Sequence, residues 1–216
     1  MTDTISDQLA QCYTGVVHDV MRKMGLRDFT LPPRLRPINP AQAMAGPAFT
    51  ILGKVDPTAD AHETLLAWTG LLSKCPSGHI WVNQPNDQTV AHMGELSAET
   101  LRDKGVRGAV ADGMIRDANF LLDLGFQTWC SGYTPRDIVG WWLPAAYDVP
   151  IRIGEVNIEP GDYMVGDRDG LIRIPRAIVE TVIEESQKDI NTESAIRTAI
   201  KSGIDPQEAY LKFGKF

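Results

Sequence analysis

Residues 79–130 constrain the fold more than any other part of this 216-residue chain. A β-prone segment at 79–83 leads into a helical pattern of apolar residues, and a run of mostly small apolar residues follows at 106–111. A second, shorter helical pattern then precedes a third predicted strand at 126–130. Because strand–helix–strand connections are right-handed in almost all proteins, such strands become parallel neighbours. The order of elements therefore predicts an α/β fold that contains a parallel sheet.

Two polar clusters follow strands of this unit, and twenty residues separate Glu95 in the first from Arg116 in the second. The first cluster opens a predicted helix and consists of Gly94, Glu95, Leu96 and Ser97. The second consists of Arg116 and Asp117, in the loop after the next strand. Loops that follow adjacent parallel strands share one edge of the sheet, and open α/β sheets bind ligands at that edge. We therefore expect the functional site to lie there.

Charge and cysteine usage narrow the classes of partner and compartment. The formal net charge is −7 and basic residues do not cluster, so we expect no nucleic-acid partner. The three cysteines, Cys12, Cys75 and Cys130, have no metal-ligand spacing and leave one unpaired, which favours a reducing compartment. No apolar run reaches the roughly 20 residues that span a bilayer, and the N-terminus has no apolar leader. We expect a cytoplasmic protein that does not contact a membrane.

The rest of the chain divides into a body at 1–175 and a helical extension at 176–216. In the body we expect an amphipathic helix at 5–24, an extended proline-rich segment at 31–47, a strand at 48–55, a helix at 59–72 and short strands joined by turns at 151–175. In the extension we expect one helix around 178–183, a second that ends at Gly203 and a third that starts at Asp205 and Pro206. The extension has too little apolar surface to fold alone, so it should pack on its own body or on a neighbouring subunit.

Adjacent Trp141 and Trp142 end an aromatic, turn-rich segment at 131–142. Neighbouring side chains of an extended backbone point to opposite sides. We therefore expect one of the two indoles to leave the core, and a subunit interface is a suitable place for it.

Several of these segments together resemble the RraA-like family, which includes the class II 4-hydroxy-4-methyl-2-oxoglutarate/4-carboxy-4-hydroxy-2-oxoadipate aldolases. The family signature is an acidic residue, twenty further residues and then Arg-Asp, which Glu95, Arg116 and Asp117 match. Other matching pieces are GPAFT at 46–50, GAVADGMIRD at 108–117, PGD at 160–162, DRDG at 167–170, IP at 174–175 and ESAIR at 193–197. The resemblance covers nearly the whole chain and specifies the family more sharply than the substrate.

The resemblance implies a swivelling β/β/α core with a helical C-terminal extension. It also implies a homo-trimer or homo-hexamer whose active sites lie at subunit interfaces. Neither the trimer nor the hexamer follows from the periodicity or composition of this chain.

The resemblance also implies roles for the two clusters. Arg116 would bind the carboxylate of a pyruvyl group through two parallel hydrogen bonds. The backbone N–H groups of Gly94, Glu95, Leu96 and Ser97 would form a second anion cradle at the start of a helix. Asp117 would hold Mg²⁺ or Mn²⁺, directly or through waters, and the cation would polarise the C2 ketone of the substrate.

Two glutamates are further candidates for catalysis. The resemblance places Glu95 near the waters of the metal, where it would orient them or relay protons. The family usually has aspartate at this position, so the reach of the longer side chain differs. Some family aldolases take a glutamate from a neighbouring subunit's C-terminal extension, and Glu193 is the candidate counterpart here.

Each of these residues also has a purely structural interpretation. Arg116 and Asp117 would then be a surface ion pair in a loop. Glu95 would be an acidic residue favoured by the helix dipole, and Glu193 would pair with Arg197 four residues later on an exposed helix.

The leading functional hypothesis is a divalent-metal-dependent lyase of the class II aldolase type. It would cleave a 4-hydroxy-2-oxo acid, such as 4-hydroxy-4-methyl-2-oxoglutarate, to pyruvate and a second oxo acid, with oxaloacetate decarboxylation as a side activity. One alternative is a non-catalytic regulator that binds a ribonuclease or helicase, as some RraA-like proteins do. Those regulators tend to lack the aspartate after the arginine and the long helical tail. Another alternative is a related lyase or decarboxylase of a different oxo acid, with substrate choice set by Tyr133, Trp141 or Trp142.

Overall fold

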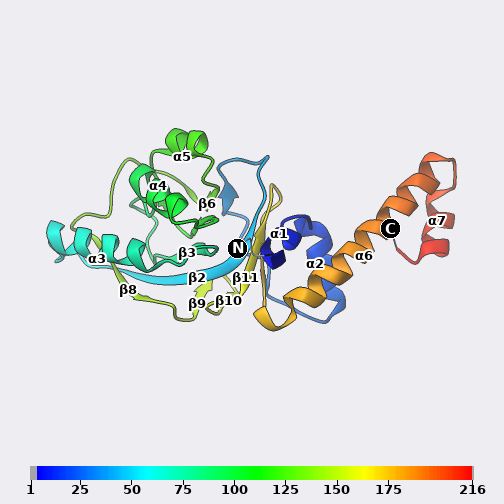
Figure 1. Ribbon diagram of the computed structural model, residues 1–216, viewed down its shortest axis with the longest axis horizontal. Coiled ribbons are helices and arrows are strands. Elements are labelled where there is room, and N and C mark those ends of the chain that lie inside the picture. The colour runs from blue at the N-terminus through cyan, green and yellow to red at the C-terminus, as the bar shows by residue number, and fades with distance from the viewer. Residues whose placement is uncertain (1–3, 216) are drawn as a thin grey trace.

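The predicted parallel unit is present in the computed structural model, which describes residues 4–215 (Figure 1). Strands β3 (Ile80–Gln84), β4 (Gly108–Ala111) and β6 (Thr128–Cys130) are parallel neighbours, and β2 (Met44–Val55) pairs in parallel with β3. Three helices connect these four strands on one face of the sheet. The mixed α/β fold expected from the sequence is therefore confirmed.

Helices and strands alternate in the middle of the chain, an uninterrupted run of strands follows them, and helices lie near both ends. The helices are α1 (Thr4–Leu9), α2 (Thr14–Lys23), α3 (Ala61–Lys74), α4 (Glu95–Asp103), α5 (Ala118–Leu124), α6 (Val179–Lys201) and α7 (Pro206–Phe213), with a 3-10 turn η1 (Arg176–Ile178) before α6. The further strands are β1 (Arg36–Pro37), β5 (Met114–Ile115), β7 (Gly132–Tyr133), β8 (Trp142–Tyr147), β9 (Ile151–Ile153), β10 (Val156–Ile158), β11 (Tyr163–Gly166) and β12 (Leu171–Ile174).

The main sheet has the order β1-β6-β4-β3-β2-β11-β12, and β8 also pairs with β2. Helices α3, α4 and α5 lie on one side of this sheet, and the β9–β10 hairpin lies on the other (Figure 1). Strand β2 begins at Met44, four residues before the predicted start at 48. The reason is that its first residues pair antiparallel with β11, which lies far along the chain and leaves no local signal.

The first predicted helix is two helices, so the prediction of one helix at 5–24 is wrong. The backbone of Tyr13 is extended, with φ −73° and ψ 152°, which interrupts the helical path between α1 and α2. The next residue, Thr14, donates from its N–H and its hydroxyl to the carboxylate of Asp167, at 2.8 and 2.7 Å. This aspartate accepts one orphan backbone N–H at the start of α2, a role that a side chain outside the helix can fill as well as a residue within it.

The C-terminal extension contains fewer helices than predicted. Helix α6 is continuous over 179–201, where the sequence suggested two helices, because no glycine or proline interrupts the polar stretch between their apolar patterns. Val182 and Ile183 of α6 are buried against α2 of the same chain. The third helix begins as expected, with the Asp205 carboxylate accepting the Gln207 N–H at 2.9 Å. The extension thus packs on its own body at its start, and α6 then leads away to α7 (Figure 1).

Both adjacent tryptophans pack against one core cluster of their own chain, and a contact of the half-buried Trp141 with a neighbouring subunit stays a prediction. Trp142 is fully buried, and Trp141 lies against the same core cluster. The backbone turns at Gly140, which has a positive φ of 68°, and the N–H groups of both tryptophans point to the Ile138 carbonyl. An extended backbone would separate the two indoles, whereas this turn places them on one side.

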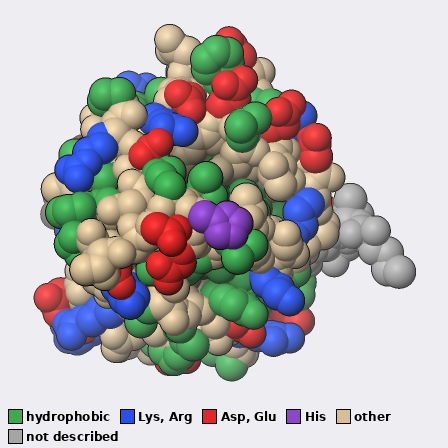
Figure 2. Space-filling view, turned by 90° about the vertical axis from the view of Figure 1, so that its left-hand side faces the viewer, with side chains coloured by type: hydrophobic (Ala, Val, Ile, Leu, Met, Phe, Trp, Pro, Cys, Tyr) green, Lys and Arg blue, Asp and Glu red, His purple; other side chains and the backbone are tan. Residues whose placement is uncertain are grey.

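Membrane and nucleic-acid partners each require a particular feature, namely a long apolar helix or a basic surface patch. Among residues 4–215, no helix combines the length and the apolar character that a membrane crossing requires. On the face shown in Figure 2, basic side chains are scattered among acidic and apolar ones rather than gathered in one patch.

Candidate functional site

The structure brings the two polar clusters into direct contact. Helix α4 begins at Glu95, and its N–H donates to Asp117 Oδ2 at 3.1 Å. The N–H of Arg116 donates to the Met93 carbonyl at 2.9 Å, which fixes the second cluster beside the first. The two loops therefore meet as the strand–helix–strand order suggested.

Gly94 permits this close approach because it has no side chain. A Cβ at this position would lie 2.9 Å from Asp117 Oδ2 and 3.2 Å from Arg116 Cγ. Contacts this short require a neighbour to move, and both neighbours are the functional candidates themselves. Glycine at position 94 is thus a requirement of the site rather than of the helix.

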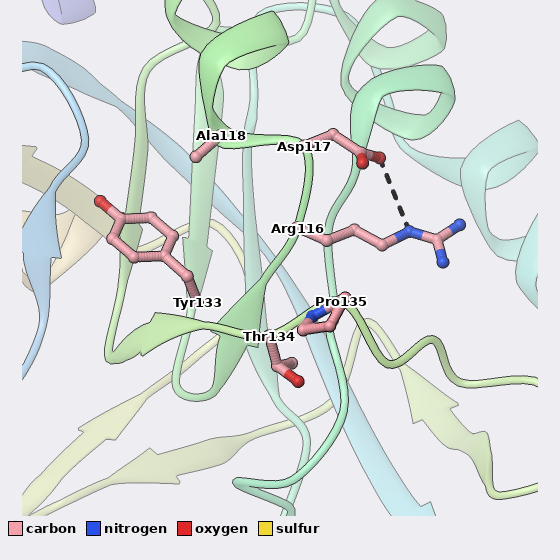
Figure 3. A pocket seen from close by; sticks show the side chains of 6 residues that line it. All are labelled: Arg116, Asp117, Ala118, Tyr133, Thr134 and Pro135. Atoms are coloured by element: carbon pink, nitrogen blue, oxygen red, sulfur yellow. Dashed lines mark ion pairs between the residues drawn. The ribbon is translucent and has the colours of Figure 1, made fainter.

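The Arg116 guanidinium lies between two carboxylates. Figure 3 shows its side chain extended towards Asp117, with Nε 3.6 Å from Asp117 Oδ2. On its other side, Nη1 is 3.4 Å from Oδ2 of Asp137. Sequence reasoning missed Asp137, which arrives because the loop after β7 folds back and Ala91 N–H donates to the Arg136 carbonyl at 2.8 Å. Its position one residue after an arginine in a polar loop offers no signal of this contact.

Asp117 has the features of a carboxylate that can take a cation. Its backbone is left-handed, with φ 55° and ψ 35°, a conformation that aspartate tolerates better than most residues. Its side chain turns from its own helix α5 to the start of α4, and Oδ1 has no protein partner among residues 4–215. Within the same residues no three carboxylate, imidazole or thiol groups cluster as ligands. One free carboxylate oxygen beside open space fits Mg²⁺ or Mn²⁺, because such ions keep most of their waters and need few protein ligands.

Arg116 and Asp117 separate two cavities. The larger has a volume of about 440 Å³, and its other walls include Leu65, Trp68, Gly94, Glu95, Leu96 and Ser97. The smaller has a volume of about 360 Å³, and its other walls are Ala118, Tyr133, Thr134 and Pro135 (Figure 3). A ligand carboxylate held at Arg116 can therefore extend to either side.

The cradle expected at the start of α4 is only partly free. The Glu95 N–H is taken by Asp117, whereas the N–H groups of Leu96 and Ser97 have no acceptor within residues 4–215. The Ser97 hydroxyl accepts the Trp68 indole N–H at 2.9 Å. The Glu95 carboxylate is half-buried at the cavity wall and has no partner in the same part of the chain.

Of the three side chains expected to set substrate choice, Tyr133 alone lines either of these cavities. Trp142 lies in the core and donates its indole N–H to the Pro85 carbonyl at 2.8 Å. Trp141 donates to Asp87 Oδ1 at 3.3 Å and lies beneath Arg136. Neither tryptophan lines these two cavities of the single chain.

Glu193 is not brought to this site within one chain. It lies on α6, and this helix projects from the end of the sheet that is farther from α4 and α5 (Figure 1). Its carboxylate accepts the Tyr13 hydroxyl and pairs with Lys215 Nζ at 2.8 Å, so its ion-pair partner is Lys215 rather than the expected Arg197. Burial together with this carboxylate raises the pKa of Tyr13 to about 12. A catalytic role of Glu193 stays a prediction that requires a second subunit.

A buried imidazole–carboxylate pair lies just before the cradle. His92 is fully buried, and its Nε2 is 3.2 Å from Oδ2 of Asp87. Burial lowers the pKa of His92 to about 4, although the neighbouring carboxylate opposes this change. Burial alone would raise the pKa of Asp87, but hydrogen bonds from Val90 and Thr89 reverse the effect and lower it to about 2. At neutral pH the pair is a neutral imidazole beside a charged carboxylate.

The free energy of unfolding is expected to fall between pH 6.5 and pH 4. The pKa of His92 is lower in the fold than its ordinary value of 6.5, so the unfolded chain binds more protons in this window and acid favours it. The full difference corresponds to about 3 kcal/mol. Asp87 adds a loss only at lower pH, as the pH falls from its ordinary value of 3.8 through about 2.

Urea denaturation of the wild type and of His92→Gln at several pH values measures this effect. His92→Gln should remove most of the pH dependence between 6.5 and 4, and His62→Gln, at an exposed histidine, should retain it. Equal pH dependence in wild type and His92→Gln would contradict the assignment.

Comparison with known proteins places these features in a family. The family described as RraA-like, Aldolase/RraA, matches residues 3–173. A protein of Halalkalibacterium halodurans named "Putative 4-hydroxy-4-methyl-2-oxoglutarate aldolase" is 29% identical over 178 residues, which are 82% of this chain and 81% of that protein. The matched region includes both polar clusters.

Solved structures agree with the fold. The crystal structure of Streptomyces coelicolor RraAS2, described as an unusual member of the RNase ES inhibitor RraA protein family, has a TM-score of 0.80 at 25% identity and covers 90% of this chain and 96% of its own. An uncharacterized protein from Pseudomonas syringae pv. tomato has a TM-score of 0.86 at 23% identity, with 98% and 95% of the two chains covered, and shows the shared fold alone. With the family match over 3–173, these likenesses establish that the chain belongs to the RraA-like, Aldolase/RraA family.

Proposed function

We propose that the protein is a divalent-metal-dependent carbon–carbon lyase that releases pyruvate from a 4-hydroxy-2-oxo acid, with oxaloacetate decarboxylation as a side activity. The observation that carries the proposal is the position of Arg116 and Asp117 between two cavities, beside free N–H groups at the start of α4. The aldolase name of the Halalkalibacterium halodurans relative supports the same class of reaction.

Substrate binding in this proposal begins with the carboxylate next to the ketone. The Arg116 guanidinium holds that carboxylate through two hydrogen bonds, and the substrate carboxylate displaces the long contact to Asp137 at 3.4 Å. Leu96 and Ser97 line the larger cavity at the start of α4, where free helix N–H groups favour negative charge. The ketone oxygen then lies near Asp117.

Cleavage requires a proton to leave the 4-hydroxyl while the C3–C4 bond breaks. The bonding electrons move towards the C2 ketone, and C3 of the resulting pyruvate enolate then accepts a proton. Asp117 would hold Mg²⁺ or Mn²⁺, which supplies electrophilic polarisation of the ketone when bound. Glu95 is the proposed proton carrier because its half-buried carboxylate lines the cavity without another partner in the described chain.

A pyruvate-release assay tests the proposal directly. The purified protein is incubated with oxaloacetate and with a panel of 4-hydroxy-2-oxo acids, in Mg²⁺, in Mn²⁺ and after chelation, and pyruvate is measured by reduction to lactate. Turnover that depends on the cation is the expected result. Absence of pyruvate from every substrate with both cations would overturn the proposal.

Replacing Gly94 with alanine is expected to lower kcat/KM by about a hundredfold, because misplacement of reacting groups by about 1 Å costs that much. The added Cβ would displace Asp117 Oδ2 or the Arg116 side chain, which lie 2.9 and 3.2 Å from its position. Gly70→Ala is the matched control, since a Cβ there meets nothing within 4 Å. Equal activity in the two variants would contradict the need for this close approach.

A second candidate is a non-catalytic regulator that binds a ribonuclease, and the likeness to RraAS2 favours it. The two candidates differ in what Arg116 and Asp117 do, because a regulator has no need of a cation or a ligand carboxylate at this edge. Stoichiometric binding to a purified ribonuclease without turnover of any oxo acid would rank the regulator first.

A further inference from the structure

His92 is a buried group that the proposed reaction leaves unused, yet the surrounding structure is built to seat it. Its ring lies 5.0 Å from the Trp142 ring, centroid to centroid, in an edge-on arrangement. On another side it faces Gly113, where a Cβ would lie only 2.8 Å from His92 Cδ2. A residue with any side chain at 113 would therefore displace the imidazole.

Asp87 is the centre of the hydrogen bonds that hold this ring. Besides His92, its carboxylate accepts the Thr89 N–H at 2.8 Å, the Thr89 hydroxyl at 2.7 Å and the Val90 N–H at 2.9 Å. It also accepts the Trp141 indole N–H at 3.3 Å. One buried carboxylate thus joins the segment before α4 to the loop that carries Asp137.

The backbone of His92 and Met93 is hydrogen-bonded to the segment that carries Arg116. The His92 N–H donates to the Met114 carbonyl at 2.8 Å, and the Met93 carbonyl accepts the Arg116 N–H at 2.9 Å. Gly94 follows immediately. A shift of the imidazole would consequently move the cradle and the Arg116 backbone together.

We propose that His92, held by Asp87, is a positioning residue that keeps the Gly94 cradle in place against Arg116 and so sets the affinity for the substrate carboxylate. The expected effect of His92 on substrate affinity rests on the proposed function. It assigns His92 no contact with the substrate, because the ring is fully buried and absent from the walls of both cavities.

The contacts of the ring select one tautomer. Nε2 faces the Asp87 carboxylate, which only accepts hydrogen bonds, so Nε2 carries the proton. Nδ1 is buried without a partner among the described residues and is then an unprotonated acceptor. An unpaired acceptor is tolerated in protein interiors more often than an unpaired donor. At pH 7, ¹⁵N spectra should therefore show His92 as the Nε2–H form, with its signal assigned by its loss in His92→Gln, and an Nδ1–H form would overturn the inference.

Steady-state kinetics of full-length variants tests the positioning role. His92→Leu is expected to raise KM for oxaloacetate about tenfold with a smaller effect on kcat, because the carboxylate contacts are present in ground state and transition state alike. His92→Gln keeps an N–H donor towards Asp87 and should return KM to within about threefold of wild type. An unchanged KM in His92→Leu would overturn the inference.

A control separates positioning from lost stability. Val182→Ala removes two methyl groups from a buried site in a different core cluster. It lowers stability without touching His92, Gly94 or Arg116. Its KM should equal that of wild type at a temperature where all variants are folded by circular dichroism. A KM rise in Val182→Ala as large as that in His92→Leu would also overturn the inference.

Binding of pyruvate alone to the Mg²⁺-loaded protein, measured by calorimetry, distinguishes a failure of the positioning role from a failure of the proposed function. Weaker binding by His92→Leu than by wild type is the expected result. A wild type that binds no pyruvate would overturn both the proposed function and this inference. Equal binding by wild type and His92→Leu would overturn the positioning role and leave the proposed function intact.

Discussion

Arg116→Lys is expected to lower kcat/KM for pyruvate release by about a thousandfold, which corresponds to about 4 kcal/mol of transition-state binding. Arginine presents a planar fork that donates two parallel hydrogen bonds to one carboxylate, whereas the lysine ammonium is a point charge on a flexible stem. The flanking carboxylates of Asp117 and Asp137 would also draw the mobile ammonium to themselves, since both lie within 4 Å of the guanidinium. Initial-rate kinetics with oxaloacetate and a 4-hydroxy-2-oxo acid measures the effect.

The control for this substitution is Arg102→Lys on α4. Arg102 is exposed to a similar degree, 42% against 40% for Arg116, and it pairs with carboxylates that line neither cavity. Its replacement should leave kcat/KM within about twofold of wild type. If Arg116→Lys retained wild-type kcat/KM, the guanidinium would be a surface partner of two aspartates and the carboxylate-binding role would be lost.

Asp117→Asn is expected to abolish cation-dependent turnover, with a loss of at least about a thousandfold in kcat. Asparagine keeps an oxygen that can accept the Glu95 N–H, so the start of α4 stays capped while the charge that holds Mg²⁺ is removed. Asp117→Ala would remove both functions, and comparison of the two variants separates them. Activity and thermal stability are measured over a Mg²⁺ titration.

The matched control is Asp123→Asn, at an exposed aspartate of α5 that lines neither cavity. It should titrate with Mg²⁺ as the wild type does. Retention of Mg²⁺-dependent turnover in Asp117→Asn would assign the cation to other ligands and leave Asp117 as a structural cap.

Local sequence patterns were sufficient to predict the parallel strand–helix–strand unit and the proximity of its two polar loops. Strands β3, β4 and β6 alternate with helices over a short stretch of chain, and their apolar periodicity is readable residue by residue. The close packing at Gly94 was not readable in this way, because it depends on where the Arg116 and Asp117 side chains lie in space.

Predictions from the sequence fail where a residue in another segment determines the local structure. Periodicity suggested one helix at 5–24, but the carboxylate of Asp167 binds the start of α2 and lets the helix begin anew. The contact between Asp137 and Arg116 was not predictable for the same reason, since only the return of the loop after β7 brings the two side chains together. A capping or ion-pairing partner more than a hundred residues away, or in another loop, leaves no periodic signal.

The sequence by itself determined the fold class, the family resemblance and the pairing of Glu95 with Arg116 and Asp117, because these depend on short-range periodicity and on spacing within one strand–helix–strand unit. Tertiary structure alone decided that Asp137 flanks Arg116, that His92 is buried against Asp87, and that Glu193 lies away from the site of its own chain. The contacts of Arg116 and Glu193 join separate segments of the chain, and His92, although close to Asp87 in sequence, is buried only because the Trp142 ring packs against it. Their geometry exists only after the sheet has ordered these segments.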